Sequence, residues 1–75
     1  MEEKFNLIEN KKEFFTEVSI DTGIAYNSLR SNYFYPVRID KELSPELYSK
    51  IDKIINKRID YQRAVRELQL KHFGK

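Results

Sequence analysis

Apolar residues in the first third of the chain recur three or four positions apart, as they do on one face of a helix. The side chains that carry this pattern are Phe14, Phe15 and Val18. Asn10 before the segment and Glu13 within it are a pair that caps a helix start. Gly23 suits the left-handed position that ends a helix. The pattern therefore predicts a first clear helix at about residues 11–22.

Two shorter apolar groups flank this helix. Residues 5–8 fit either a short strand or a single helical turn, and the pattern favours neither. After Gly23, a second helix fits residues 26–34, because Leu29 and Tyr33 lie four positions apart and the polar residues fall on the other side. We therefore expect two helices joined by a short turn at the glycine.

Alternate positions in residues 33–39 would point to opposite faces if the segment were a strand. One set is Tyr33, Tyr35, Val37 and Ile39, and the other is Phe34, Pro36 and Arg38. Pro36 weakens this interpretation, because proline cannot donate a hydrogen bond to a sheet. The segment is therefore predicted to be either a short edge strand, which would form a wing, or an extended connector.

A long C-terminal helix is predicted over residues 45–73. Ser44, Pro45 and Glu46 supply a hydroxyl cap, a proline at the first helical position and an acid near the positive helix end. Neither Gly nor Pro follows until the penultimate residue. Such a helix is about 44 Å long at 1.5 Å per residue. Because this exceeds a domain of this size, we expect the helix to bend near residues 58–60 or to project beyond the globule.

The long helix carries a seam of positions that are alternately four and three residues apart, which is heptad spacing. These positions are Leu47, Ile51, Ile54, Arg58, Tyr61, Val65, Leu68 and His72. Further apolar residues widen the first half of the seam, which suits packing within a globule. The narrower second half suits a partner helix. We therefore expect a dimerisation segment at about residues 58–73, with Tyr61, Val65 and Leu68 as its contacts.

Composition limits the chemistry that the chain can perform. The 75 residues contain no cysteine and one histidine, which excludes a thiolate metal site and leaves no histidine cluster for a metal. Neither a phosphate-binding glycine loop nor a nucleophile–histidine–acid arrangement is evident. We therefore expect a protein that is not an enzyme, with no catalytic residue, no metal, no cofactor and no small-molecule substrate.

Length and hydropathy place the protein among small globular domains. Apolar types make up 40% and charged types 35% of the chain, and we treat residues 1–75 as one domain. The apolar runs are only a few residues long, and residues 1–4 do not have the pattern of a signal peptide. The expected location is therefore cytoplasmic, without a membrane partner.

Charge is distributed unevenly, although the net charge is only +2. No acid occurs from Gly23 to Ile39, whereas Arg30 and Arg38 lie in that stretch among four aromatic residues. A segment without acids can approach phosphate oxygens without like-charge repulsion. The predicted second helix and the connector after it are therefore the part of the chain best suited to nucleic acid.

A helix, a glycine turn and a second helix have the outline of a helix-turn-helix. Val18 and Leu29 would meet between the helices, and Ile24 would fill the space beneath the turn. The first turn of the second helix would then face DNA, where Asn can bond adenine and Arg can bond guanine. The candidate DNA-binding residues are Tyr26, Asn27, Ser28, Arg30, Ser31 and Arg38.

The turn and second helix resemble the headpiece of lac-repressor-type regulators and, more broadly, the phage lambda-repressor and Cro class. The segment that carries the resemblance is residues 18–31, Val-Ser-Ile-Asp-Thr-Gly-Ile-Ala-Tyr-Asn-Ser-Leu-Arg-Ser. A third helix opened by a serine cap, as at Ser44, extends the resemblance over roughly residues 14–55. The resemblance implies a helix-turn-helix core at about residues 11–55, with Tyr26 and Asn27 as the base-contacting pair.

Three features depart from that family. Its second-helix arginine falls at Ser31, one position after Arg30. Its second apolar anchor falls at Asn32, so that Tyr33 or Phe34 must take its place. The longer connector before the third helix could hold a wing of the kind found in mercury-resistance regulators and excisionases.

We therefore expect a mainly α-helical domain of three or four helices that binds double-stranded DNA as a homodimer, with residues 26–34 in the major groove. It would be a phage-like or mobile-element regulator of transcription, acting as a repressor, with half-sites about one helical turn apart. An excisionase-like architectural DNA binder remains open, and strand pairing at residues 33–39 would favour it. Two further alternatives also remain open. One is a protein-binding inhibitor module, which an acidic or apolar second helix would favour, and the other is a subunit that folds only with another chain.

Overall fold

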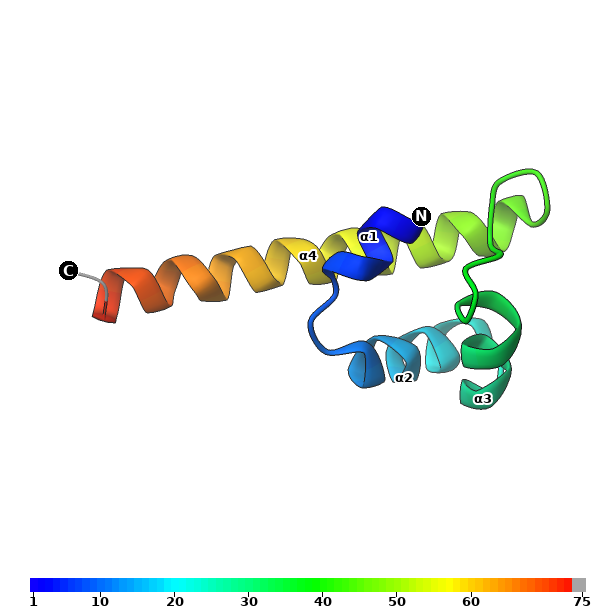
Figure 1. Ribbon diagram of the computed structural model, residues 1–75, viewed down its shortest axis with the longest axis horizontal. Helices are drawn as coiled ribbons and strands as arrows, with labels where there is room; N and C mark the ends of the chain where they lie inside the picture. Colours follow the sequence, from blue (N-terminus) through cyan, green and yellow to red (C-terminus); the bar gives the residue numbers. More distant parts are fainter. Residues whose placement is uncertain (74–75) are drawn as a thin grey trace.

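The computed structural model describes residues 1–73, with side chains through Lys71. The elements in chain order are α1 (Glu2–Leu7), α2 (Lys11–Thr22), α3 (Tyr26–Ser28), the π-helical segment η1 (Leu29–Tyr33) and α4 (Pro45–Phe73). α1 and α2 both pack on α4, and α3 follows α2 at the end that points toward the start of α4 (Figure 1). The protein is therefore mainly α-helical with a long C-terminal helix, as the sequence predicts.

Residues 5–8, for which the pattern left two alternatives, belong mostly to a helix. Glu2 and Glu3 lie in the first turn of α1, where acids stabilise the positive helix end. Phe5 is buried, and Ile8 follows the helix in an extended conformation with its side chain also buried. α1 is therefore a short helix that contributes two residues to the core.

The predicted helix at residues 11–22 is confirmed as α2. The side-chain oxygen of Asn10 accepts a hydrogen bond from the Glu13 backbone N–H at 3.1 Å, which caps the first turn. The Asn10 amide also donates to the Glu13 carboxylate at 2.5 Å. Gly23 ends the helix with φ 77°, and its N–H donates to the Ser19 carbonyl. Both ends are therefore set by the local sequence.

The predicted helix at residues 26–34 is present, but its second part is π-helical and ends at Tyr33. Phe34 N–H donates to the Leu29 carbonyl at 3.1 Å, and Tyr35 N–H donates to the Arg30 carbonyl at 2.9 Å. These bonds span five residues instead of four. The wider turn buries Phe34 together with Leu29. Tyr33, which the spacing predicts as the second inner residue, is only half-buried against the core.

Of the two alternatives for residues 33–39, the structure has the connector and not the strand or wing, because no strand forms among residues 1–73. One antiparallel bridge joins Phe34 to Val37 across a tight turn, within which the Tyr35–Pro36 peptide bond is cis. Ile39 then enters the core. The segment is therefore a connector anchored at both ends, in which Pro36 occupies a turn.

α4 is one continuous helix, and its second half projects beyond the globule (Figure 1). The molecule measures 46 × 22 × 20 Å along its principal axes. The core contacts of α4 come from its first half: Ile51, Ile54, Ile55 and Ile59. From Asp60 through Lys71, no described residue of the helix is buried. Across residues 1–73, no helix has the length and apolar character needed to cross a membrane.

Four phenylalanines from three parts of the chain form the centre of the core. Phe5, Phe14, Phe15 and Phe34 have ring centroids 4.7–6.0 Å apart in every pair. Tilted and edge-on contacts of this kind stabilise aromatic clusters beyond the area that they bury. The cluster fixes α1, α2 and the end of η1 to one another, and so holds α3 in place.

Candidate nucleic-acid interface

The turn between α2 and α3 is closed by side-chain hydroxyls. Ser19 Oγ donates to the Ile24 carbonyl at 2.6 Å, and Thr22 Oγ1 donates to the Val18 carbonyl at 2.7 Å. The Ile24 N–H in turn donates to Thr22 Oγ1 at 3.3 Å. Through its bond to the Ile24 carbonyl, the Ser19 hydroxyl ties the end of α2 to the residues that lead into α3.

The apolar positions expected between the two helices occupy the core. Val18 and Leu29 are each 0% exposed and belong to the same buried cluster. Ile24 is half-buried against that cluster, beneath the turn. These residues pack on the inner side of α3 and η1, and the other side chains of these two segments therefore lie on the outer side.

Most of the candidate DNA-binding residues lie on that outer side. Asn27, Arg30 and Ser31 are exposed, as is Asn32, and Ser28 is half-buried. Tyr26 differs from the expectation, because it is half-buried and its ring centroid lies 5.5 Å from that of Phe15 in an edge-on contact. Tyr26 therefore supports the core as well as bordering the exposed face.

The two arginines of the acid-free stretch lie at either side of the turn at residues 34–37. The Arg30 guanidinium carbon lies 5.5 Å from the centroid of the half-exposed Tyr35 ring, which holds the cation toward the turn. Arg38 is exposed just beyond that turn, and its backbone N–H donates to the Tyr33 carbonyl. Within the described part of the chain, neither guanidinium has a carboxylate partner. The exposed face therefore presents hydrogen-bonding groups and positive charge.

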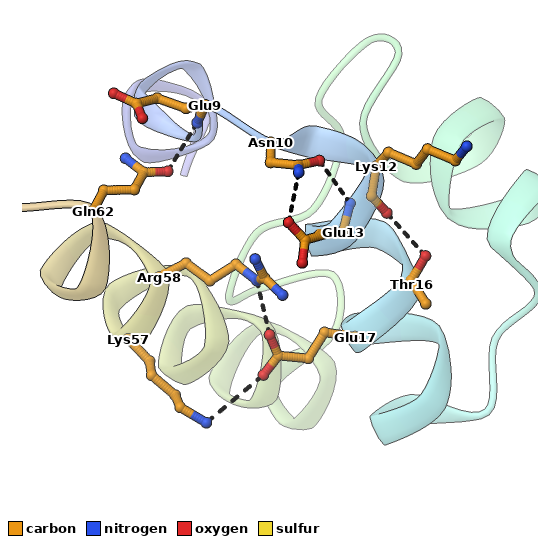
Figure 2. A network of polar contacts seen from close by, with 9 residues as sticks. All are labelled: Glu9, Asn10, Lys12, Glu13, Thr16, Glu17, Lys57, Arg58 and Gln62. Atoms are coloured by element: carbon orange, nitrogen blue, oxygen red, sulfur yellow. Dashed lines mark hydrogen bonds and ion pairs between the residues drawn. The ribbon is translucent and has the colours of Figure 1, made fainter. Parts of the chain in front are cut away.

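The acid Glu17 of α2 lies in the contact between α2 and α4 (Figure 2). Glu17 accepts a hydrogen bond from Arg58 Nε at 2.8 Å and lies 3.9 Å from Lys57 Nζ. Arg58 is a polar residue at a seam position of the long helix. Its partner is Glu17 of the same chain, so it serves to hold α2 against α4.

Four further polar contacts join α4 to α1 and to the link between α1 and α2. Lys4 Nζ donates to Asp52 at 2.8 Å, and this hydrogen bond raises the pKa of the Lys4 ammonium above its usual value. Gln62 accepts a hydrogen bond from the Glu9 N–H at 2.8 Å and donates to the Leu7 carbonyl at 3.0 Å. Arg66 pairs with the Glu9 carboxylate. These contacts separated by about fifty residues were not foreseen from the sequence.

The expected dimerisation residues lie on the projecting half of α4. Tyr61 is 69% exposed and Leu68 is 56% exposed, whereas Val65 is half-buried. Tyr61 and Val65 line one wall of a groove of about 280 Å³, whose other wall is the start of α2. The side chain of His72, the last seam position, lies outside the described residues. Between Tyr61 and Leu68, the described part of the seam is therefore largely open to contact.

Comparison with protein-family models, with curated proteins and with solved structures gave no match. Function must therefore be inferred from the chemistry and geometry of the exposed face itself.

Proposed function

We propose that this protein binds double-stranded DNA in a sequence-selective manner and represses transcription at its binding site. α3 and η1 enter the major groove, and the protein binds as a homodimer through the projecting half of α4. Asn27 and Arg30 contact base edges, because their side chains can bond adenine and guanine bidentately. Ser28, Ser31 and the Tyr26 hydroxyl bond bases or phosphates, and Arg38 contacts phosphate.

One observation carries the proposal: a helix fixed by the core on its inner side exposes amide, hydroxyl and guanidinium groups, with no acid in its stretch of sequence. A face built for a protein partner would more often be rich in aromatic and other apolar groups at its centre. The exposed residues of this face are Asn27, Arg30, Ser31 and Asn32. An exposed polar face whose cations have no carboxylate partner within the described residues is well suited to the grooves and phosphates of a duplex.

The test is selection of bound sequences from a random duplex pool, followed by binding measurements at several salt concentrations. Wild type is expected to enrich a motif and to lose affinity steeply as salt rises, because cations on the protein release counterions from DNA. Arg30→Ala should weaken binding and relax the preference at one base pair, by about 1–3 kcal/mol of discrimination. Arg38→Ala should instead lower the salt slope by about one and keep the motif.

Arg63→Ala is the matched control, because Arg63 is an exposed arginine on the projecting half of α4 and away from α3. It removes the same charge and should leave the enriched motif and the salt slope close to those of wild type. If the wild-type protein enriches no sequence, or if Arg63→Ala changes binding as much as Arg30→Ala, the proposal fails. A protein partner should then be sought for the same face.

A further inference from the structure

The heptad seam of α4 is covered along its first half, where α1 and α2 pack, and is largely uncovered along its second. Ile51 and Ile54 are buried in the core, and Glu17 of α2 reaches the seam at Arg58. Tyr61 and Leu68 continue the same stripe but are exposed. One apolar stripe therefore has two parts, of which the chain itself covers only one.

The uncovered part begins where α2 begins. α2 runs antiparallel to α4, with its first residues beside the middle of α4 (Figure 1). The groove at this point has Asn10 and Glu13 of α2 on one side and Tyr61, Val65 and Gln69 of α4 on the other. A helix laid along the uncovered stripe would therefore lie in line with α2, with one of its ends against the first turn of α2.

We propose that the helix that fills this position is the projecting half of α4 from a second copy, lying antiparallel to the first. The inference rests on the proposed function in one respect, because it gives the geometry of the homodimer proposed there. Each copy then covers the stripe of the other, so the same surface serves on both, as two-fold symmetry requires. The two-fold axis passes between Val65 and Leu68, which places Val65 of each copy opposite Leu68 of the other.

A parallel pair would conflict with the contacts already made. In a parallel pair, equivalent seam positions face each other, so the two Arg58 side chains would meet. The two α2 helices would also have to fit between the α4 helices, because each covers the stripe up to Arg58. The antiparallel pair avoids both problems, because each uncovered half ends at the start of the partner's α2.

Charges on the two surfaces are complementary in the antiparallel pair. The uncovered stripe is flanked on α4 by Gln62 and Gln69 on one side and by Ala64 and Lys71 on the other, so these flanking positions hold no acid. Glu13 at the start of α2 is exposed and, within the described residues, accepts only from the Asn10 amide and has no cation partner. The antiparallel pair brings Lys71 of one copy toward Glu13 of the other, and Gln62 of one toward Gln69 of the other.

This geometry sets the distance between the two DNA-binding faces. The starts of the two α4 helices lie roughly 65 Å apart along the common axis at 1.5 Å per residue. α3 lies toward that end of each copy (Figure 1). The proposal therefore places the half-sites close to two helical turns apart, where the motif by itself led us to expect one.

Cysteine crosslinking of the full chain tests the orientation, and the absence of native cysteine makes each introduced thiol unique. A mixture of Val65→Cys and Leu68→Cys chains should form a mixed disulfide under mild oxidation. Tyr61→Cys should form none with itself, because the two positions lie roughly 16 Å apart along the axis, far beyond the Cα separation that a disulfide spans. Self-crosslinking of Tyr61→Cys without the mixed disulfide would overturn the proposal.

Spin labels at Ser49→Cys give a second measure that needs no disulfide, because Ser49 is exposed on the first half of α4. The antiparallel pair predicts a label-to-label distance of roughly 50 Å. A parallel pair would keep the labels within roughly 20 Å, because packed helices lie about 10 Å apart. A short distance, or no dipolar coupling because the chain is monomeric, would contradict the proposal.

The charge contact is tested with Glu13→Gln, which keeps a side chain suited to the capping position but removes the charge. It should weaken dimerisation by about two- to fivefold, as expected for an exposed ion pair, and Lys71→Gln should weaken it equally. The double variant should be no weaker than either single variant. Additive losses in the double variant would count against a Glu13–Lys71 contact.

Failure of this inference differs from failure of the proposed function. If the chain enriches a DNA motif but shows a parallel dimer or none, the antiparallel pair is wrong and DNA binding stands. If the mixed disulfide and the long distance appear but no motif is enriched, the antiparallel pair stands and DNA binding is wrong.

Discussion

Gly23 has a φ of 77°, a backbone conformation that favours glycine. A Cβ placed there would have no atom within 4 Å, so a substitution changes the unfolding free energy through the backbone conformation alone. Gly23→Ala therefore introduces no clash. It should cost about 1 kcal/mol of unfolding free energy, because the left-handed conformation costs about 1–2 kcal/mol and a stiffer unfolded chain offsets about 0.4–1 kcal/mol of it. Gly23→Asn should cost less, since Asn tolerates this conformation. Urea unfolding measures both, and equal losses would contradict this explanation.

The Lys4–Asp52 contact should make stability depend on alkaline pH. The hydrogen bond that Lys4 donates to Asp52 raises the pKa of Lys4 above its usual value of 10.5. The contact therefore contributes fully below pH 10.5 and is lost as pH rises through the raised pKa. The urea midpoint of wild type should exceed that of Lys4→Gln at pH 8, and the difference should shrink above pH 10.5. Lys12→Gln, at an exposed lysine of α2, should show no such change in the difference.

Residues whose partners are near in sequence were predictable, and those with distant partners were not. Asn10 with Glu13, and Gly23 after Ser19, are local arrangements, and the structure has them as the sequence indicates. The contacts of Glu17 with Arg58 and of Gln62 with the Glu9 N–H join positions more than forty residues apart. No periodicity within one segment carries information about which residue of another segment will lie beside it.

At the scale of elements, the π-helical turn accommodates one residue more than an α-helix would between Leu29 and Phe34. Five positions separate these two buried residues, and η1 closes that span with hydrogen bonds over five residues. Asn32 lies where the resemblance led us to expect an apolar anchor, and the π-helical turn explains the difference, because it brings Phe34 into the core instead. Helical periodicity at 3.6 residues per turn predicts Tyr33 as the inner residue, because it assumes an α-helix throughout.

Deletion of the exposed Asn32 should therefore be tolerated. It leaves four positions between Leu29 and the buried phenylalanine, which an α-helix places on one face. We expect a cooperative urea transition and a loss of unfolding free energy smaller than that of Phe34→Ala, which should cost about 3–5 kcal/mol. A deletion variant as destabilised as Phe34→Ala would show that the π-turn is needed for more than spacing. Amide exchange of Phe34 and Tyr35 would report whether their hydrogen bonds survive.

Element bounds follow closely from the sequence where caps and breakers agree. α2 and α4 have the expected bounds, because Asn10, Gly23 and Pro45 mark their ends. α1 remained ambiguous, since six residues are too few to show a period. The pattern at residues 33–39 left a strand and a connector as alternatives, because a turn with buried anchors on both sides gives the same alternation of side chains as a strand.

At the scale of the whole molecule, an exposed seam predicts that stability depends on protein concentration. A partner that binds only the folded chain raises the melting temperature as concentration rises. Wild type should therefore melt higher at higher concentration, and Leu68→Asp, which places a charge in the seam, should not show this dependence. Leu70→Asp is the matched control, because Leu70 is 62% exposed but lies off the seam. Identical concentration dependence in both variants would show that the seam is not an interface.

Because α4 is one continuous helix, its length fixes the distance and the rotation between the core and the exposed seam. Its first half is fixed in the core and its second half carries the seam, with no bend between them to absorb a change of length or phase. One residue inserted after Asp60 would rotate the seam by about 100° relative to α3, although both parts would remain intact. A full heptad would nearly restore the phase and lengthen an antiparallel pair by roughly 21 Å. In the proposed DNA complex, the length of α4 would set the spacing between the half-sites, and an insertion would change that spacing without altering any of the candidate DNA-binding side chains.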